Sequence, residues 1–506
     1  MTSRRSVDRE DVRRQIGFAL QNELMQGHCY ALMHTICQAA SRKLRISRDV
    51  VEEHAREMDE FYVFDRYITL AELDNAEEVV AERVAQLLKV QNDLVSRAFR
   101  SGPNDEIQLD KQQDRAIDLM NASAIGLVTG PPGSGKTTII QFVLKEFHAR
   151  GVLYALAAPT GKAAIRLQET SNRPAFTIHR LLQWTPFGFV HNENNPLPHE
   201  AILVDESSMI DIKLCADLLR ATDPDRTRII FIGDADQLPP VGPGAPFRDL
   251  IASSKVPTIY LDTVHRAAKK SWIYRNAPSI LKGEGIELED TDDFEFHEME
   301  TEDGDCLGEA ALGIVNSLLS KGFDAEEFQV LSPMRKREGG TLLLNRYLQG
   351  QLNPDSLGMQ LKDDVFVSEG DPVIQVKNDY DLSVMNGEVG KVDSISQGER
   401  SLVVRFPDQP EPRYLRYKGT RDYRNLELAY ALTVHKFQGS QIPIVIFLCH
   451  SIHRFMLSRQ LLYTALTRAR KCVYLVGDAA GVRHALRTIR DTQRKTRLLE
   501  KLLSRI

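Results

Sequence analysis

The sequence predicts an α/β protein with parallel sheets, a helical N-terminal region and a small β-rich domain. Short apolar runs rich in β-branched residues, such as 125–129 and 201–204, alternate with segments of helical periodicity. That alternation is typical of a parallel sheet with crossover helices. Residues 346–425 instead show alternating segments separated by turns, which predict a small inserted β-barrel. The chain of 506 residues is too long for one core, so about three domains are expected.

Composition and charge restrict the class of protein. The chain is 42% hydrophobic and 26% charged, as in globular proteins, and its net charge is −6. A global basic field is therefore excluded, and a nucleic-acid site has to be a local stripe. No apolar run approaches the ~18 residues of a membrane span, and the N-terminus lacks the apolar core of a signal peptide. The six cysteines form no CxxC pair, so we expect a cytoplasmic protein without membrane contact.

Residues 1–104 are expected to form a helical, winged-helix-like domain. Helical periodicity covers 12–24, 31–44 and 70–89, while 61–69 is predicted as a pair of short strands. Such a domain is compatible with DNA contact and equally with packing against the rest of the chain.

The first parallel-sheet domain, expected at 105–255, contains Gly130-Pro-Pro-Gly-Ser-Gly-Lys-Thr137, which fits G-x-x-x-x-G-K-[ST]. An apolar strand precedes this segment and a helix follows, which is the context of a nucleotide-binding phosphate loop. Its backbone N–H groups and the helix N-terminus favour phosphate. We expect Lys136 to reach the β and γ phosphates and Thr137 to bind Mg²⁺. The expected nucleotide-binding residues of the loop are Gly130, Pro131, Gly133, Ser134, Gly135, Lys136, Thr137 and Thr138.

Acidic and amide side chains follow two further strands of the same sheet. Asp205 and Glu206 come directly after strand 201–204, so Asp205 is expected to hold Mg²⁺ and Glu206 to orient or deprotonate a water. Gln237 follows the next strand and can sense the γ-phosphate. Gln113, before the first strand, is the candidate for reading an adenine edge, because a carboxamide both donates and accepts. A plain surface role for Gln113 stays open.

The second parallel-sheet domain is expected at 256–345 and 426–506, on both sides of the inserted barrel. Within it, the acidic residues 283–305 are predicted as a solvated surface excursion. The basic tail, residues 483–505, is predicted as one helix that packs on the body or contacts DNA. Its predicted inner stripe is Leu498, Leu499, Leu502 and Leu503.

Residues 184–199 contain Pro, Gly and Asn and are predicted as a short exposed β-hairpin, with a plain connecting loop as the alternative.

Nine segments resemble, in order and spacing, those of superfamily 1 DNA helicases of the 5′→3′ branch, close to the RecD-like group. They are GPPGSGKTT, APTGKAA, TIHRLL, VDESSM, GDADQLPPVGPG, VHR, NDYDLSVMNGEVG, LTVHKFQGSQ and YTALTRAR. The resemblance implies two RecA-like motor domains with ATP between them. It also implies an ATP-dependent helicase that moves 5′→3′ on single-stranded DNA and separates tailed duplexes in DNA repair or recombination. Longer members carry further N-terminal domains, of which residues 1–104 resemble the last.

Residue roles follow from the same resemblance. Lys136, Glu206 and Gln237 carry over as catalytic residues of the first domain, and Arg266 and Arg468 as arginines that reach the γ-phosphate from the second. Residues that would grip DNA phosphates without reading sequence are Pro159, Thr160, His179, Thr433, His435, Lys436 and Ser440. The hairpin resembles a strand-separating pin, and the barrel resembles a strand clamp.

Two other functions remain open at this point. The chain could be a nucleotide-dependent nucleic-acid-binding switch that never unwinds, or an RNA helicase. The sequence identifies no protein partner, and a monomer is compatible with it.

Overall fold

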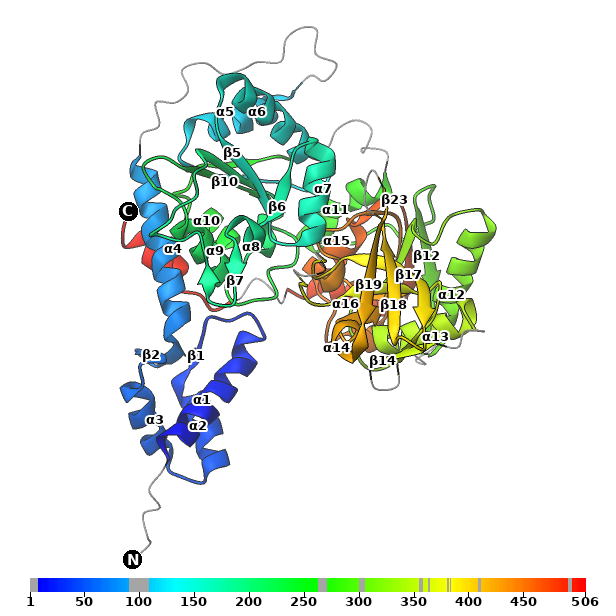
Figure 1. The fold of residues 1–506 in the computed structure, drawn as a ribbon, viewed down its shortest axis with the longest axis horizontal. Helices are drawn as coiled ribbons and strands as arrows, with labels where there is room; N and C mark the ends of the chain where they lie inside the picture. Colours follow the sequence, from blue (N-terminus) through cyan, green and yellow to red (C-terminus); the bar gives the residue numbers. More distant parts are fainter. Residues whose placement is uncertain are drawn as a thin grey trace, which may run out of the picture.

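The structure is a computed structural model that describes residues 8–90, 109–262, 271–299, 305–354, 358–362, 365–379, 382, 384–407, 411–489 and 494–506. It contains two parallel sheets with helices on both faces, a separate antiparallel sheet and a helical N-terminal region (Figure 1). The predicted fold class is therefore confirmed. Within the described ranges, no helix combines the length and hydropathy that crossing a bilayer requires.

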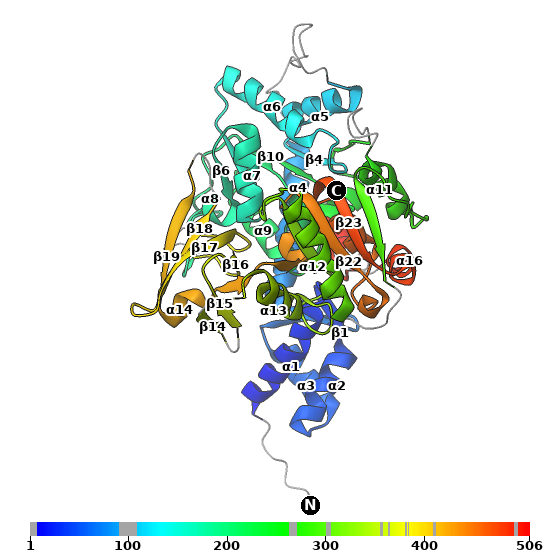
Figure 2. The ribbon, with the colours of Figure 1, turned by 90° about the vertical axis from the view of Figure 1, so that its right-hand side faces the viewer.

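The N-terminal region projects from one end of the molecule in both ribbon views (Figure 2). Its elements are α1 (Arg9–Leu24), β1 (Tyr30–Leu32), α2 (Met33–Leu44), α3 (Arg48–Glu57), β2 (Phe61–Phe64) and β3 (Tyr67–Leu70). The predicted strand pair is present, but β1 adds a third strand, because Tyr30–Leu32 pairs antiparallel with β3. The following helix, α4 (Ala71–Lys89), contributes Leu73, Val80 and Val84 to the core of the next domain.

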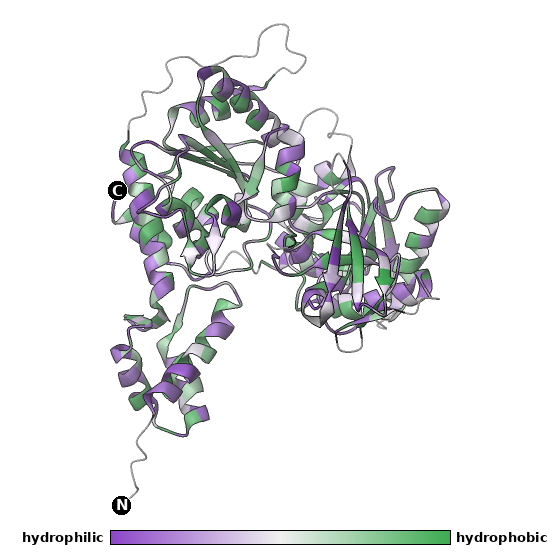
Figure 3. Cartoon of the chain, viewed as in Figure 1, coloured by the Kyte–Doolittle hydropathy of each residue, from purple (hydrophilic) through white to green (hydrophobic). Residues whose placement is uncertain are grey.

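The first lobe is built on a six-stranded sheet in which every described pairing is parallel. In spatial order its strands are β11 (Thr258–Tyr260), β4 (Ile125–Thr129), β10 (Arg228–Gly233), β9 (Ala201–Val204), β5 (Tyr154–Ala158) and β6 (Ala175–Thr177). One face is covered by α5 (Lys111–Ala122), α6 (Lys136–Arg150) and α7 (Gly161–Ser171). The other is covered by α4, α8 (Ile178–Leu181), α9 (Ile212–Arg220) and α10 (Pro246–Ala252). The apolar strands stand out between more polar helices (Figure 3).

The predicted boundary after residue 255 is wrong, because β11 pairs with β4 and so belongs to the first lobe.

The second lobe is a five-stranded parallel sheet, ordered β12 (Phe294–Glu298), β23 (Ala469–Gly477), β22 (Ile442–Cys449), β13 (Phe328–Ser332) and β21 (Ala431–Thr433). Helices α11 (Trp272–Lys282), α15 (Arg459–Leu466) and α16 (Ala479–Arg487) cover one face, and α12 (Asp305–Ser320) and α13 (Thr341–Leu352) the other.

The prediction that 283–305 is only a surface excursion is wrong, because the segment contains the edge strand β12. The Phe294 ring is fully buried and stacks on Trp272 with centroids 3.7 Å apart. The acidic residues around Phe294 lower the mean hydropathy of the segment, so its sequence did not predict a strand.

The small domain is an antiparallel sheet of β16 (Pro372–Gln375), β17 (Val389–Ser396), β18 (Ser401–Phe406), β19 (Arg413–Lys418) and β20 (Leu426–Leu428). The hairpin β14 (Met359–Lys362) and β15 (Val365–Val367) and the short helix α14 (Gly419–Tyr423) complete it. Its predicted start at 346 falls inside α13, whose Asn345 exchanges hydrogen bonds with Ala431 of the second lobe. The other domain limits remain predictions.

The C-terminal segment, residues 494–506, does not continue the preceding helix. α16 ends at Arg487, and the chain then returns to the first lobe, where α17 (Leu498–Leu503) packs against α4 and α10. The prediction of one helix over 483–505 is therefore wrong. Leu498 and Leu502 are fully buried there, whereas Leu503 is exposed, so only part of the predicted stripe faces inward.

Candidate functional site

The phosphate loop lies between β4 and α6, at the carboxyl edge of the first sheet. Gly133 and Gly135 have φ angles of 80° and 86°, which side-chain-bearing residues rarely adopt. A Cβ at Gly130 would lie 2.7 Å from the Leu261 carbonyl oxygen. The loop therefore needs its glycines, as the motif predicts.

The loop presents polar groups suited to phosphate. The Nζ atom of Lys136 donates to the carbonyl of Pro131 at 2.9 Å and also to that of Gly130. Burial lowers the pKa of Lys136, while the charges of Asp234, Glu206 and Asp205 act in the opposite direction. The buried Ser134 hydroxyl has no hydrogen-bond partner among the described residues. A triphosphate would supply acceptors for both side chains, so the loop fits ATP.

Asp205 and Glu206 follow β9 and lie next to the phosphate loop. The backbone N–H of Glu206 donates to Asp205 Oδ1 at 2.9 Å. Burial, aided by the charge of Glu206, raises the pKa of Asp205 to about 6. Glu206 has a φ of 52° and pairs with Arg166 of α7, with Oε1 and Nη1 3.4 Å apart.

The donor set suits Mg²⁺ held together with a nucleotide. In the part of the chain that the structure describes, no group of three or more His, Cys, Asp or Glu residues forms a complete metal site. Mg²⁺ in nucleotide sites takes one or two protein oxygens, with phosphates and water as its other ligands. The Asp205 carboxylate and the Thr137 hydroxyl meet that requirement.

Residues 234–244, termed here the sensor loop, follow β10 and join the two lobes. The Gln237 amide donates to Asp234 Oδ2 at 3.1 Å, and the Tyr463 hydroxyl of the second lobe donates to the same oxygen at 2.8 Å. The backbone of Leu238 receives a hydrogen bond from Gln438 and donates to Thr464 Oγ1 at 2.9 Å. The residues on either side of Gln237 in this loop, Asp234 and Leu238, thus contact the second lobe, and the predicted role of Gln237 at the γ-phosphate stays a prediction.

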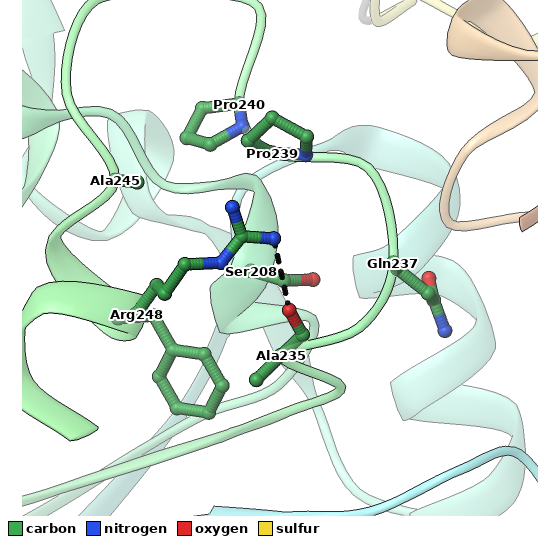
Figure 4. A pocket seen from close by; sticks show the side chains of 8 residues that line it. Ser208, Ala235, Gln237, Pro239, Pro240, Ala245 and Arg248 are labelled. Carbon is green, nitrogen blue, oxygen red and sulfur yellow. Dashed lines mark hydrogen bonds between the residues drawn. The ribbon is translucent and has the colours of Figure 1, made fainter. Parts of the chain in front are cut away.

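The far side of the sensor loop closes over a small pocket (Figure 4). Ser208, Pro239, Pro240 and Arg248 line it, while Gln237 points away from its centre. Arg248 of α10 donates to the Ala235 carbonyl at 3.1 Å. The pocket therefore lies under the loop, on the side away from the Gln237 amide group.

Arg468 brings a second-lobe cation to this cluster. Its side chain is 1% exposed, and it donates to the carbonyls of Thr464 and Ser440 at 3.3 and 3.2 Å. Burial lowers its pKa, and the charges of Glu206 and Asp234 in the first lobe oppose that shift. Arg468 therefore lies within electrostatic reach of the first-lobe carboxylates. The other predicted arginine, Arg266, lies outside the described residues.

Gln113 is buried beside the phosphate loop. Its side-chain oxygen accepts from the Asp110 N–H at 3.0 Å in a capping box, and its amide lies 3.4 Å from the Ser134 carbonyl. The alternative of a plain surface residue is therefore wrong, whereas adenine recognition stays a prediction.

The predicted DNA-binding residues fall into two groups, one on each lobe. In the first lobe, Pro159 and Thr160 precede α7, and the His179 ring packs on Phe189 with centroids 5.7 Å apart. Thr160 also meets the second lobe, because a Cβ on Gly439 would lie 3.2 Å from Thr160 Oγ1. The neighbouring Ser440 hydroxyl is buried and, in the described ranges, has no hydrogen-bond partner.

Thr433 and His435 line an open cleft of about 500 Å³ in the second lobe. Basic residues line it as well, and Phe455 and Met456 add an exposed apolar wall, 59% and 39% exposed. The basic residues are Arg335, Lys336 and Arg337. Lys436 lies outside this lining and pairs with Glu427, with Nζ and Oε2 2.6 Å apart. A cleft with cations and an aromatic ring suits a single strand of nucleic acid.

The predicted hairpin is present as β7 (Trp184–Thr185) and β8 (Gly188–Phe189), with Phe187 fully exposed at its tip. The plain-loop alternative is thus wrong, and the role as a strand-separating pin stays a prediction.

Sequence reasoning missed several residues of the site. Asp234 stands in the predicted sensor segment and could have been found as an acid at a strand end. The three consecutive basic residues Arg335, Lys336 and Arg337 could have been found in the sequence as a candidate phosphate-binding run. Arg166, Tyr463 and Phe455 carry no local signal, since only the fold brings them to the site.

Three family models match the chain. They are described as an AAA domain, matching residues 108–298, an ATP-dependent RecD-like DNA helicase SH3 domain, matching 344–406, and a UvrD-like helicase C-terminal domain, matching 428–476. Among solved structures, Pif1 helicase from Bacteroides is similar with 19% identity and a TM-score of 0.47, over 76% of this chain and 95% of that one.

Curated relatives are more similar in sequence. The ATP-dependent RecD2 DNA helicase of Deinococcus radiodurans is 38% identical over 78% of this chain, which spans only about half (52%) of that relative. The RecBCD enzyme subunit RecD of Mycolicibacterium smegmatis is 32% identical over 81% of this chain and 76% of its own. That of Mycobacterium tuberculosis is 31% identical over 76% and 73%. The chain therefore belongs to the RecD-like family of DNA helicases.

Proposed function

We propose that the protein is an ATP- and Mg²⁺-dependent helicase that moves 5′→3′ along single-stranded DNA and separates duplex DNA. The observation that carries this proposal is the lobe boundary beside the phosphate loop, where Tyr463 of the second lobe donates to Asp234 at 2.8 Å and the charge of Glu206 acts on the buried Arg468. A cation from one lobe beside a phosphate loop of the other is suited to coupling hydrolysis to lobe movement. The name of the Deinococcus radiodurans relative, a DNA helicase, supports DNA as the substrate, and DNA repair or recombination as the setting is part of the same proposal.

The proposal assigns a role to each residue of the nucleotide site. Lys136 and the loop N–H groups bind the β and γ phosphates, and Asp205 and Thr137 hold Mg²⁺, which neutralises phosphate charge when bound. Glu206 accepts a proton from the attacking water. Arg468 stabilises charge on the transferring phosphoryl group, and its contact draws the lobes together.

Movement along DNA follows from the two groups of DNA-binding residues. Thr160 and His179 belong to the first lobe and Thr433 and His435 to the second, so lobe closure changes the distance between the two grips. Alternating grip then converts closure and opening into steps. Separating a base pair costs ~1.4 kcal/mol of stacking per step, less than one nucleotide cycle supplies.

A strand-displacement assay tests the proposal. Duplexes with a 5′ tail, a 3′ tail or blunt ends are incubated with ATP and Mg²⁺, using wild type and Lys136→Ala. We expect displacement of the 5′-tailed duplex only, and none by Lys136→Ala, which loses the phosphate contact. Displacement confined to 3′ tails contradicts the polarity. DNA-stimulated hydrolysis without displacement assigns a switch, and stronger stimulation by RNA assigns an RNA helicase.

A further inference from the structure

Arg494, in the C-terminal segment, binds the end of the sensor loop. Its guanidinium donates to the carbonyls of Gly242 and Gly244 at 2.5 and 2.8 Å, and to that of Pro240. Three carbonyls of one loop thus converge on a single planar group. A guanidinium presents several N–H donors in a rigid planar fork and can bind them together, and an ammonium does not reproduce that geometry.

The same guanidinium lies flat against the N-terminal region. A Cβ on Gly27 would lie 2.3 Å from Arg494 Cζ, so only glycine leaves room for it. The backbone N–H of Gly244 donates to the Gly27 carbonyl at 2.9 Å, and the N–H of Cys29 donates to the Lys495 carbonyl at 2.8 Å. The N-terminal region, the sensor loop and the C-terminal segment therefore meet at Arg494.

Neighbouring residues fix the C-terminal segment in this position. Thr496 Oγ1 donates to Asp249 of α10 at 2.9 Å, and the Arg497 N–H donates to Glu77 of α4 at 2.8 Å. Beyond them, Leu498 and Leu502 are fully buried in the first-lobe core. The segment thus provides a rigid base from which Arg494 reaches the loop.

The two ends of the sensor loop are bound by different parts of the protein. Its beginning holds Asp234 and Gln237 at the lobe boundary, where Tyr463 and Thr464 of the second lobe bind it. Its other end is bound by Arg494. Motion of the second lobe acts on the first end, so the position of Gln237 depends on how firmly the second end is held.

We propose that Arg494 is a positioning residue for ATP hydrolysis, which anchors the sensor loop to the N-terminal region so that Gln237 and Asp234 keep their place as the lobes move. This inference rests on the proposed function, because it assigns Arg494 to the hydrolysis site described above. Arg494 touches neither the phosphate loop nor Asp205 among its described contacts. Its loss should therefore impair the rate of hydrolysis more than the binding of ATP.

The test compares Arg494→Ala and Arg494→Lys with wild type and with Arg505→Ala. Arg505 lies in the same segment and pairs with Glu78 of α4, away from the sensor loop, so it is the matched control. DNA-stimulated kcat and KM for ATP are measured, together with hydrogen exchange of the amides in residues 234–244. We expect Arg494→Ala to lower kcat by about tenfold or more with KM changed by less than about twofold, since small misplacements near chemistry cost that much.

We further expect faster exchange across the sensor loop in Arg494→Ala, an intermediate effect in Arg494→Lys and wild-type behaviour in Arg505→Ala. If Arg494→Ala fails to fold, the Arg494→Lys values decide the outcome. Equal kcat and equal loop exchange for Arg494→Ala and Arg505→Ala would overturn the proposal, as would a change confined to the thermal midpoint. If the wild type hydrolyses no ATP, the proposed function fails, while the exchange result still decides whether Arg494 anchors the loop.

Discussion

At the scale of single residues, the side chain of Gln113 makes hydrogen bonds in two places, at the N-terminus of α5 and at the phosphate loop. Its oxygen completes the capping box of α5 and its amide approaches the Ser134 carbonyl of the phosphate loop. The carboxamide thus connects the phosphate loop to the N-terminus of α5. The two contacts use different atoms, so substitutions can separate them.

Gln113→Glu should keep the capping bond and lose the amide donor, whereas Gln113→Ala should lose both. We expect weaker ATP binding in both variants but a loss of ~1 kcal/mol in the free energy of unfolding only in Gln113→Ala. Nucleotide titration and thermal unfolding measure the two effects. If Gln113 also reads adenine, both variants lose their preference for ATP over GTP. ATP binding by Gln113→Glu at the wild-type level contradicts a role for the amide.

The residue scale is also where sequence patterns were most informative about the nucleotide. Lys136, Asp205 and Gln237 lie where strand ends predict them, because each acts within a few residues of its own strand. Tyr463 and Arg166 contact the same cluster from helices distant in sequence. Nothing in their local sequence distinguishes them from core or surface residues.

At the scale of elements, the second-lobe cleft is formed by loops that follow β13, β21 and β22. Because parallel strands end at the same edge, residues 333–337, His435 and Phe455 come together although they are far apart in sequence. Arg454 lies over the Phe455 ring at 5.1 Å and leaves the ring 59% exposed. An exposed ring beside cations is suited to stacking a base.

Phe455→Ala should weaken binding of single-stranded DNA by ~1–3 kcal/mol, the usual contribution of one stacked base. Binding of a matching abasic strand should be unaffected, because that strand has no base to stack. Fluorescence titration with both strands measures the difference, and Leu319→Ala, at an exposed site on α12, is the control. An equal loss on both strands contradicts base stacking at Phe455.

The contact between α4 and the C-terminal segment contains a buried acid, Glu77, which accepts from the Arg497 N–H. Burial raises the pKa of Glu77 to about 7. The unfolded chain loses this proton near pH 4.5, the ordinary value for the group, whereas the folded chain keeps it up to about pH 7. The stability from Glu77 is therefore complete below about pH 4.5 and lost as the pH rises to about 7.

Glu77→Gln removes this titration and keeps an acceptor for Arg497. We expect similar thermal midpoints for variant and wild type at pH 4.5, and a more stable variant at pH 8, by up to ~3 kcal/mol. Thermal unfolding at the two pH values measures the difference. Equal stability of wild type and variant at pH 8 would contradict the prediction, because it would show that ionisation of Glu77 does not lower the free energy of unfolding.

Element boundaries were the least predictable part of the fold. The strand β12 was missed because acidic residues surround the buried Phe294, and the tail was predicted as one helix because its leucines have helical spacing. The Leu498 and Leu502 side chains pack on α4 and α10, which local periodicity cannot identify. In both segments the observed structure depends on burial against other parts of the fold, which the local sequence does not reveal.

At the scale of the whole molecule, the described contacts between the two lobes include several buried polar contacts and the side chain of Leu238, which packs in the second-lobe core. Asp234–Tyr463, Leu238–Thr464 and Leu238–Gln438 join the sensor loop to the second lobe. Lys162 of the first lobe also lies 5.2 Å above the Phe437 ring of the second. Such contacts can break and reform more readily than a continuous apolar interface, as a cyclic motor requires.

The resemblance of the ordered motifs to those of RecD-like helicases was sufficient to predict this two-lobe arrangement, and motifs such as GPPGSGKTT and VDESSM do lie at strand ends. The meeting of the C-terminal segment with the N-terminal region was not predictable. Its contacts, such as Lys495 to His28 and Arg497 to Asp74, join residues more than 400 positions apart and follow no periodic pattern.

The central claim is that both lobes act on one triphosphate, so the most direct measurement is the rate of DNA-stimulated ATP hydrolysis by Arg468→Ala. The control is Arg470→Ala, an exposed arginine two positions later, in β23. We predict that Arg468→Ala lowers kcat by about 10³-fold, as for other arginines that act on a transferring phosphoryl group, while ATP binding to the first lobe persists. Hydrolysis by Arg468→Ala at the rate of Arg470→Ala would contradict the claim.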